Sequence, residues 1–271
     1  MRGTGAVGKV IIHTHIPKTG GETTRALLET MLPAGSVYVI DQAAQQEPYV
    51  GNAHAEIVRT THDFPARRPL EVPDIRAVTG HISYGWHSRA GMLDEWVSYV
   101  CTLRDPYQRV MSMYKHAKRN PWAWGFGACS HWGGFEDFLS NGPQDVRNGV
   151  CRRLSPDKPT TRGALRSLRK YDVVGFTAAY PQFAEQLSDL IGAKRPQYYR
   201  RNIAHKGMHA VSAYERALVD AYASEDVGLW KLVCPPVMVH VPGPSWVAGQ
   251  YYRVKQKAKR YWGRVRWTGL R

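Results

Sequence analysis

Residues 9–32 constrain the fold of this chain more than any other stretch, because they predict a buried strand, a turn and a helix in direct succession. The β-branched run at residues 10–12 predicts the strand. Apolar residues at helical spacing follow, and they are Ala26, Leu27, Leu28, Met31 and Leu32. A strand that leads straight into a helix is typical of α/β proteins built on a parallel sheet.

The segment between strand and helix, residues 17–21 (PKTGG), predicts an anion-binding turn. A turn here aims backbone N–H groups and the positive end of the helix dipole at one point. The Lys18 ammonium and the hydroxyls of Thr19, Thr23 and Thr24 lie close to it in sequence, so phosphate or sulfate oxygens are natural ligands. The alternative is a glycine turn that only reverses the chain. A kinase fits poorly, because Lys18 precedes the glycines instead of following them as in GxxxxGK[ST].

The string HIPKTGG at residues 15–21 resembles a signature of the sulfotransferases related to the heparan-sulfate and chondroitin-sulfate enzymes and their bacterial relatives. In that family the loop holds the 5′-phosphosulfate of 3′-phosphoadenosine 5′-phosphosulfate (PAPS), the sulfuryl donor. The resemblance implies donor contacts from Pro17, Lys18, Thr19, Gly20, Gly21, Glu22, Thr23 and Thr24. Glu22 departs from the family pattern, since a carboxylate beside a polyanionic donor is unfavourable unless it faces solvent.

A second segment follows the apolar run at residues 96–103, which predicts a central parallel strand. The strand ends at Arg104, and a helix begins at Pro106. Arg104 and Ser112 can converge on one phosphate, through a guanidinium fork and a hydroxyl. The alternative is a surface ion pair in which Asp105 contacts Arg104 or Arg109.

The string RDPYQRVMSMY at residues 104–114 resembles the second signature of the same family. There the arginine and the serine bind the 3′-phosphate of the donor. Two signatures in the right order, about eighty residues apart, are far more specific than either one alone. Together they imply a PAPS-dependent enzyme that needs no metal ion.

A catalytic base is expected where the predicted strand at residues 75–78 ends, because a histidine at that point can take a proton from an acceptor hydroxyl. His81 lies there, and the family carries a Gly-His pair followed by an aromatic residue at this place, with its histidine as general base. His87 and Glu22 are the alternative bases. Lys18 is expected to offset charge that develops on the bridging oxygen of the donor.

Further basic residues are candidate ligands for an acidic substrate or for the donor. Arg152 and Arg153, like His87, are candidate substrate contacts, with a solvated charge run as the alternative. Lys206 and Gly207 resemble the loop that closes over the nucleotide in related sulfotransferases, although Met208 stands where arginine is common.

The remaining segments complete a predicted α/β fold. Further strands are expected at 36–40 and 171–176, and further helices at 135–139, 162–170, 180–191, 212–224 and 226–233. This order favours a P-loop-like open parallel sheet, flanked by helices on both faces, with its site at the carboxyl ends of the strands. We expect a sulfotransferase domain at residues 1–234 and a basic, aromatic C-terminal extension at residues 235–271.

Composition narrows the partners and the compartment. Lys plus Arg exceed Asp plus Glu by 37 − 22 = 15, which favours anionic partners such as nucleotides or acidic glycans. The chain shows neither a signal peptide nor about eighteen consecutive apolar residues, so a cytoplasmic protein is expected. The aromatic and basic tail suits an anionic membrane surface, and a helix packed on the domain is the alternative. The four cysteines are scattered without CxxC spacing, so neither a zinc site nor a disulfide framework is indicated, and a Cys129–Cys151 pair stays open.

These observations predict an O-sulfotransferase that moves a sulfuryl group from PAPS to a hydroxyl acceptor. The resemblance favours a carbohydrate acceptor, and a tyrosyl peptide or a phenolic metabolite stays open. A protein of another class, a non-catalytic binder of polyanions or nucleic acid driven by the basic tail, is the competing hypothesis, although no specific nucleic acid is indicated.

Overall fold

The computed structural model describes residues 9–40, 75–119, 132–194 and 211–234 of the 271-residue chain. The chain divides into two compact units, Met1–Leu229 and Trp230–Arg271. The fold reported below is that of the first unit. The predicted extension at 235–271, the loop with Lys206 and Gly207, and Cys129 all lie outside the described residues. The predicted domain boundary therefore stays a prediction.

The described part of the chain contains one sheet of five parallel strands in the order β2-β3-β1-β4-β5. The strands are β1 (Val10–Thr14), β2 (Val37–Val39), β3 (Ala77–Gly80), β4 (Val97–Leu103) and β5 (Val173–Phe176). Every residue of the central strands β1 and β4 is buried, as expected for parallel strands that are covered on both faces. The predicted open parallel α/β sheet is confirmed.

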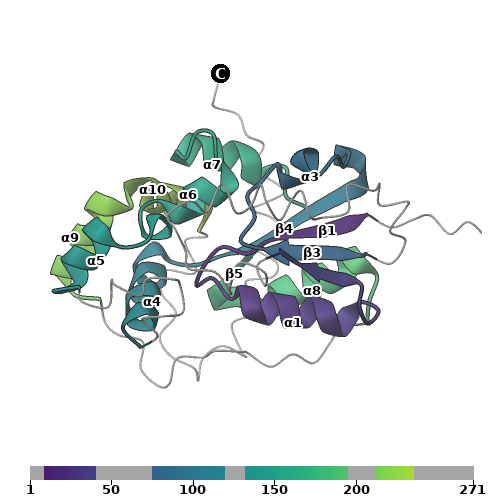
Figure 1. Cartoon of the computed structure of the whole chain (residues 1–271), viewed down its shortest axis with the longest axis horizontal. Helices are drawn as coiled ribbons and strands as arrows, with labels where there is room; N and C mark the ends of the chain where they lie inside the picture. Colours follow the sequence, from purple (N-terminus) through teal and green to yellow (C-terminus); the bar gives the residue numbers. More distant parts are fainter. Residues whose placement is uncertain (1–8, 41–74, 120–131, 195–210, 235–271) are drawn as a thin grey trace, which may run out of the picture. The chain divides into compact units, whose positions relative to one another are not determined.

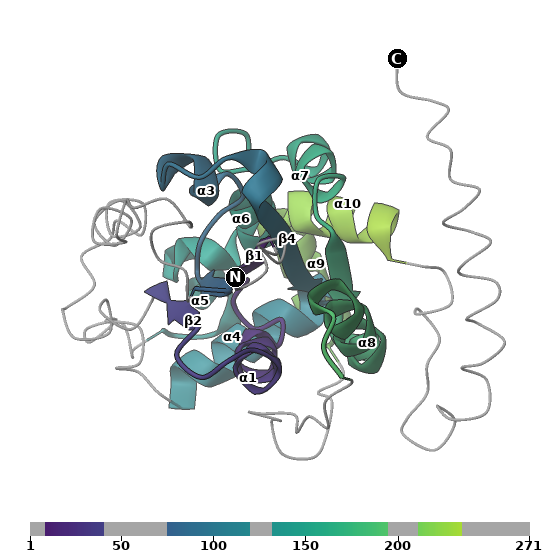
Figure 2. The ribbon, with the colours of Figure 1, turned by 90° about the vertical axis from the view of Figure 1, so that its right-hand side faces the viewer.

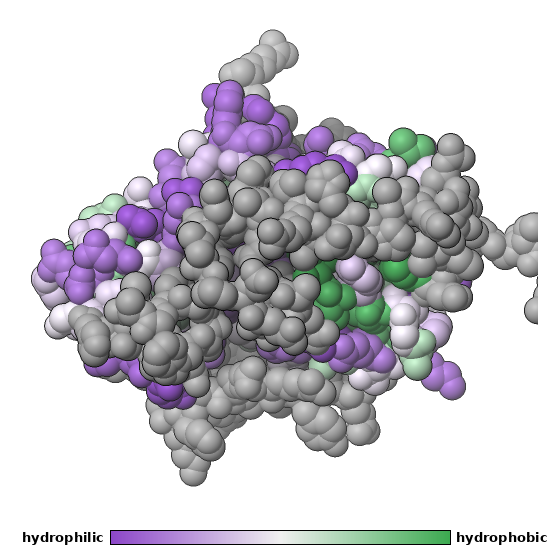
Figure 3. All heavy atoms as spheres, in the orientation of Figure 1, coloured by the Kyte–Doolittle hydropathy of each residue, from purple (hydrophilic) through white to green (hydrophobic). Residues whose placement is uncertain are grey.

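Helices cover both faces of the sheet. Figures 1 and 2 show α1 (Gly21–Met31) and α8 (Tyr180–Ile191) on one face, and α3 (Trp86–Arg89) and α7 (Thr161–Leu168) on the other. The first face encloses an apolar core of residues from the central strands and the two long helices, which include Ile11, Leu27, Leu28, Val100, Phe183 and Leu187. At the surface, α7 presents hydrophilic side chains, and Arg162 and Arg166 are exposed there (Figure 3).

A second core lies beyond the carboxyl ends of the strands. It is formed by α4 (Pro106–Arg119), α5 (Phe135–Asn141), α9 (Ala213–Tyr222) and the first residues of α10 (Ser224–Val233). Its buried side chains include Val110, Met113, Phe138, Leu139, Val219 and Val227. The short helix α6 (Gly149–Leu154) adjoins this region and packs on α7. The carboxyl edge of the sheet therefore faces a helical layer with a hydrophobic core of its own.

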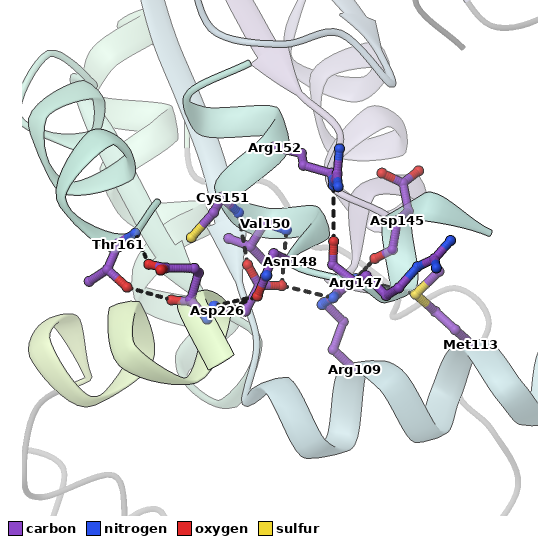
Figure 4. Close-up of polar contacts among 11 residues, drawn as sticks. Arg109, Met113, Asp145, Arg147, Asn148, Val150, Cys151, Arg152, Thr161 and Asp226 are labelled. Atoms are coloured by element: carbon purple, nitrogen blue, oxygen red, sulfur yellow. Dashed lines mark hydrogen bonds and ion pairs between the residues drawn. The ribbon is translucent and has the colours of Figure 1, made fainter. Parts of the chain in front are cut away.

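A buried ion pair joins these elements. The Nη2 atom of Arg109 lies 2.9 Å from the Asp226 carboxylate, and neither side chain is more than 1% exposed. The same carboxylate accepts hydrogen bonds from the backbone N–H groups of Val150 and Cys151 at the start of α6 (Figure 4). The surface pair of Arg109 with Asp105 that the sequence allowed is wrong, because Arg109 is buried and pairs with a residue 117 positions away.

Two further predictions, a possible disulfide bond and the lack of a membrane span, can be compared with the described residues. Cys151, for which the sequence left a disulfide bond open, is buried and carries a free thiol. Within the described ranges, no helix has the length and the apolar character needed to cross a membrane.

We expect Asp226→Asn to destabilise the protein by roughly 3–5 kcal/mol, because it leaves the Arg109 guanidinium buried without a counter-charge. Urea denaturation of wild type and variant measures this loss. Asp220→Asn is the control, since Asp220 is exposed on α9 and accepts only a hydrogen bond from the Tyr107 hydroxyl among its described contacts. Equal losses in the two variants would contradict a structural role for the buried pair.

Candidate functional site

The loop between β1 and α1 has a strained and closely packed backbone. Lys18 adopts a left-handed conformation with φ of 65°, which is unfavourable for a residue with a side chain and is often found at functional sites. Gly20 has φ of 94° and begins the helix. A Cβ atom at Gly21 would lie 1.7 Å from the His15 ring, so glycine alone fits there. The predicted turn between strand and helix is therefore present, and its anion ligand stays a prediction.

The amino terminus of α1 is directed at this loop. Its first hydrogen bond within the helix runs from the Thr24 N–H group to the Gly20 carbonyl at 3.1 Å. The N–H groups of Gly21 and Glu22, in the first turn, have no carbonyl one turn earlier in the helix. Among the described residues, no side chain caps this helix end. An anion placed at the loop would receive these donors and the positive end of the helix dipole.

Lys18 lies among other cations. Burial, followed by the charges of Arg104 and Arg119, lowers the pKa of Lys18 from 10.5 to about 8, while the Glu22 carboxylate acts in the opposite direction. The Glu22 carboxylate therefore acts on the Lys18 ammonium from the first turn of α1. A cluster in which cations repel one another favours the binding of an anion, because the anion removes the repulsion.

Arg104 connects the two segments that the sequence singled out. It follows the last residue of β4, and its Nη1 atom donates a hydrogen bond of 3.1 Å to the Lys18 carbonyl oxygen. The hydroxyl of Thr177, after β5, donates to the carbonyls of Thr19 and Leu103, each at 3.0 Å. The loop and the carboxyl ends of β4 and β5 thus form one continuous edge.

Ser112 lies on the side of α4 that faces this edge. Ser112, His116 and Arg119 stand at positions i, i+4 and i+7 of the helix, so they share one side. Burial and the nearby charges of Lys18 and Arg119 lower the pKa of His116, and Arg119 in turn lowers the pKa of Lys18. Ser112 is partly exposed. Ser112 therefore shares a side of α4 with two residues whose charges act near Lys18, and its predicted contact with a phosphate stays a prediction.

His81 lies directly after β3, in a row of three imidazole rings. The His81 ring is 4.5 Å from the His15 ring, and the His15 ring is 5.7 Å from that of His13. Because the His15 ring packs against Gly21, His81 stands one ring away from the start of α1. The candidate base is thus brought next to the loop between β1 and α1, and its role as base stays a prediction.

His13 and His15 were not predicted as site residues. Burial, with a smaller contribution from His81, lowers the pKa of His13 to about 3 and that of His15 well below 6.5. Both rings are therefore neutral near pH 7. The sequence carried a signal for this pair, because residues two apart on a strand point to the same face. Without the position of His81 the pair had no partner to indicate a site.

Several other predicted site residues make internal contacts. The Thr19 hydroxyl is fully buried and donates to the Ile16 carbonyl at 2.8 Å, and the Thr24 hydroxyl lies 2.9 Å from the Tyr180 hydroxyl. The imidazole of His87 is buried, with its two nitrogens bonded to the Tyr99 hydroxyl and the Asp94 carboxylate at 2.8 and 2.5 Å. Their predicted ligand contacts stay predictions.

The two neighbouring arginines of α6 differ sharply. Arg152 is exposed, and its Nε atom donates to the Arg147 carbonyl at 3.0 Å. Arg153 is 6% exposed and pairs with Asp145 at 2.8 Å. Their predicted contact with an acidic substrate is untested. Within the described ranges, no group of three or more His, Cys, Asp or Glu side chains is arranged to hold a metal ion.

We expect the affinity of this site for inorganic sulfate to fall as the pH rises through about 8, because Lys18 attracts an anion only while it is protonated. The fall should reach up to about tenfold per pH unit. Sulfate keeps both charges across this range, so calorimetric titration between pH 7 and 9.5 isolates the protein group. Lys18→Arg should flatten the profile, because arginine stays charged. Lys158→Arg, at an exposed lysine, should leave it unchanged; a flat wild-type profile would contradict the assignment.

Comparison with known proteins adds three structural likenesses. No family model and no curated protein matches the sequence. A sulfotransferase from Alicyclobacillus acidocaldarius is similar at a TM-score of 0.44 and 15% identity, over 86% of this chain and 99% of that one. The sulfotransferase domain from the curacin biosynthetic pathway gives a TM-score of 0.41 and 10% identity, over 93% and 98% of the two chains.

The third likeness is to a mouse sulfotransferase complexed with PAP. Its TM-score is 0.38 and its identity 12%, over 94% of this chain and 86% of the mouse chain. All three TM-scores lie below 0.5 and all three identities below 25%, so these likenesses do not establish the family of this chain.

Proposed function

We propose that this protein is an O-sulfotransferase, which moves the sulfuryl group of PAPS to a hydroxyl acceptor. The hydrogen bond between the Arg104 guanidinium and the Lys18 carbonyl carries this proposal. It joins the two segments that resemble the family signatures, although they are 86 residues apart in the chain. One nucleotide can therefore reach both.

The charges of the described residues fit a donor that is anionic at both ends. Lys18 and the N–H groups at the start of α1 suit the 5′-phosphosulfate. Arg104 suits the 3′-phosphate, because its guanidinium stays ionised even though burial lowers its pKa. Ser112 adds a hydroxyl on the facing side of α4. The mutual repulsion of Lys18, Arg104 and Arg119 would be relieved by such a ligand.

The donor supplies the sulfuryl group, and the residues of this chain supply orientation and charge. The N–H groups of α1 hold the equatorial oxygens, and the Lys18 ammonium offsets negative charge on the oxygen that leaves. His81 accepts the proton of the acceptor hydroxyl as that oxygen bonds to sulfur. Holding the two reactants in line accounts for much of the acceleration.

His81 is the base favoured by the geometry. Its ring stands one ring away from the start of α1. The His87 ring packs instead against Tyr99 and bonds Asp94. The Glu22 carboxylate raises the pKa of Lys18, so its charge acts on the donor-binding lysine in this proposal.

The acceptor class rests on the resemblance, which favours a saccharide hydroxyl. The formal net charge of +15 suits an acidic glycan in particular. A membrane-surface location through residues 235–271 also belongs to this proposal, and those residues lie outside the described part of the chain.

We expect the protein to bind adenosine 3′,5′-bisphosphate and to discriminate against the 2′,5′ isomer by at least about tenfold, which isothermal titration calorimetry measures. Arg104→Gln should abolish the discrimination, because the residue that recognises the 3′-phosphate is lost. Arg25→Gln is the control, since Arg25 is paired with Glu29 on α1 at 2.8 Å. A wild type that binds both isomers equally would favour a general polyanion binder.

We expect His81→Asn to keep nucleotide affinity while turnover falls by at least about 100-fold, because proton transfer loses its acceptor. Incubation of PAPS with a panel of glycans, tyrosyl peptides and phenols, read as mass gain of one sulfuryl group, measures turnover and identifies the acceptor. His87→Asn tests the alternative base in parallel. Unchanged turnover in His81→Asn would remove His81 from the mechanism.

A further inference from the structure

Arg153 holds the backbone of the candidate base. Its side chain is almost fully buried, and its guanidinium bridges two partners on different segments. The Nη1 atom donates to the carbonyl oxygen of His81, and the Nη2 atom pairs with the Asp145 carboxylate at 2.8 Å. A forked cation of this kind fixes the distance between its two partners.

A second bond ties the same segment to Arg153. The backbone N–H group of Tyr84 donates to the Arg153 carbonyl at 2.8 Å. Residues 81–84, which follow β3, are therefore held at two points by one residue of α6. On the other side, the His15 N–H group binds the Gly80 carbonyl at 2.9 Å, and the His15 ring supports that of His81. His81 is thus fixed through both its backbone and its ring.

Asp145, the partner of Arg153, belongs to the network of polar contacts that Figure 4 shows. The Asp145 carbonyl accepts a hydrogen bond of 2.9 Å from Arg109, which pairs with Asp226. Asp226 binds the first N–H groups of α6, the helix that carries Arg153. Burial raises the pKa of the Asp145 carboxyl, but the charge and the hydrogen bond of Arg153, together with the charges of His81 and Arg109, hold that pKa below its usual value of 3.8.

We propose that Arg153 is a positioning residue, which acts on the reaction by fixing His81 and not by contacting the acceptor. This inference rests on the proposed role of His81 as base. It replaces the expectation from the sequence that Arg153 binds an acidic substrate. Loss of the fork frees the His81 carbonyl and the loop after β3, and a displacement of about 1 Å at a catalytic group can cost on the order of 100-fold in rate.

The first test separates turnover from acceptor binding in Arg153→Gln. We expect kcat to fall by about 10- to 100-fold, equally for acidic and neutral acceptors, while acceptor KM and bisphosphate affinity stay within about twofold of wild type. The matched control is Arg147→Gln, because Arg147 also donates to a backbone carbonyl, that of Ser140 at 3.0 Å. A rise in KM confined to acidic acceptors would overturn the proposal and make Arg153 a substrate contact.

The second test needs no activity. In protein labelled with ¹⁵N- and ¹³C-histidine, the His81 ring signals, identified by their loss in His81→Asn, should move in Arg153→Gln and stay in place in Arg147→Gln. The His87 signals, from a ring bound to Tyr99 and Asp94, should stay in place in both. Unmoved His81 signals in a folded Arg153→Gln variant would overturn the proposal.

Asp145→Asn keeps the proposal testable if Arg153→Gln does not fold. This variant removes the ion pair but leaves the bond from Arg153 to the His81 carbonyl. We therefore expect a smaller shift of the same His81 signals. The absence of any shift would overturn the proposal. Failure of the proposed function gives a different result: wild type would then bind no adenosine bisphosphate and modify no acceptor, while the histidine signals would still decide whether Arg153 fixes His81.

Discussion

The contact between the Arg104 guanidinium and the Lys18 carbonyl is the interaction on which the rest of the site depends. It brings two like charges together at a residue whose backbone is already in an unfavourable conformation. The cost is offset around it, by the burial of Thr19 and by the two bonds of Thr177 to neighbouring carbonyls. The fold thus maintains an unfavourable local arrangement with contacts from neighbouring segments, as is common where stability is exchanged for function.

Much of this architecture could be predicted, because the spacing of apolar residues over short stretches indicates which of them form strands and helices. The helix α8 was expected at residues 180–191 and is found at those bounds, since its apolar residues repeat at helical spacing. The strands β1 and β4 were expected from unbroken apolar runs. The helices α3 and α6, with four and six residues, were not expected, because a period of 3.6 residues cannot be recognised over one turn.

The candidate site was predictable only in part, for a different reason. Lys18, Arg104 and His81 each stand at the end of a strand, and parallel strands bring their carboxyl ends to one edge. The partners that hold them come from far along the chain. Nothing local indicated that Arg109 would pair with Asp226, that the Thr19 hydroxyl would turn inward, or that Arg153 would reach back 72 residues to the His81 carbonyl.

The double role of α4 has a consequence for how such a protein can diversify. One side of this helix carries Met113 and Ala117 into the second core, and another carries Ser112 toward the loop. Because α4 joins that core to the proposed donor site, we expect exchange of a core side chain such as Phe138 to move α4 and Ser112 with it. Such an exchange would alter the proposed site while every residue proposed to bind the donor stays in the sequence.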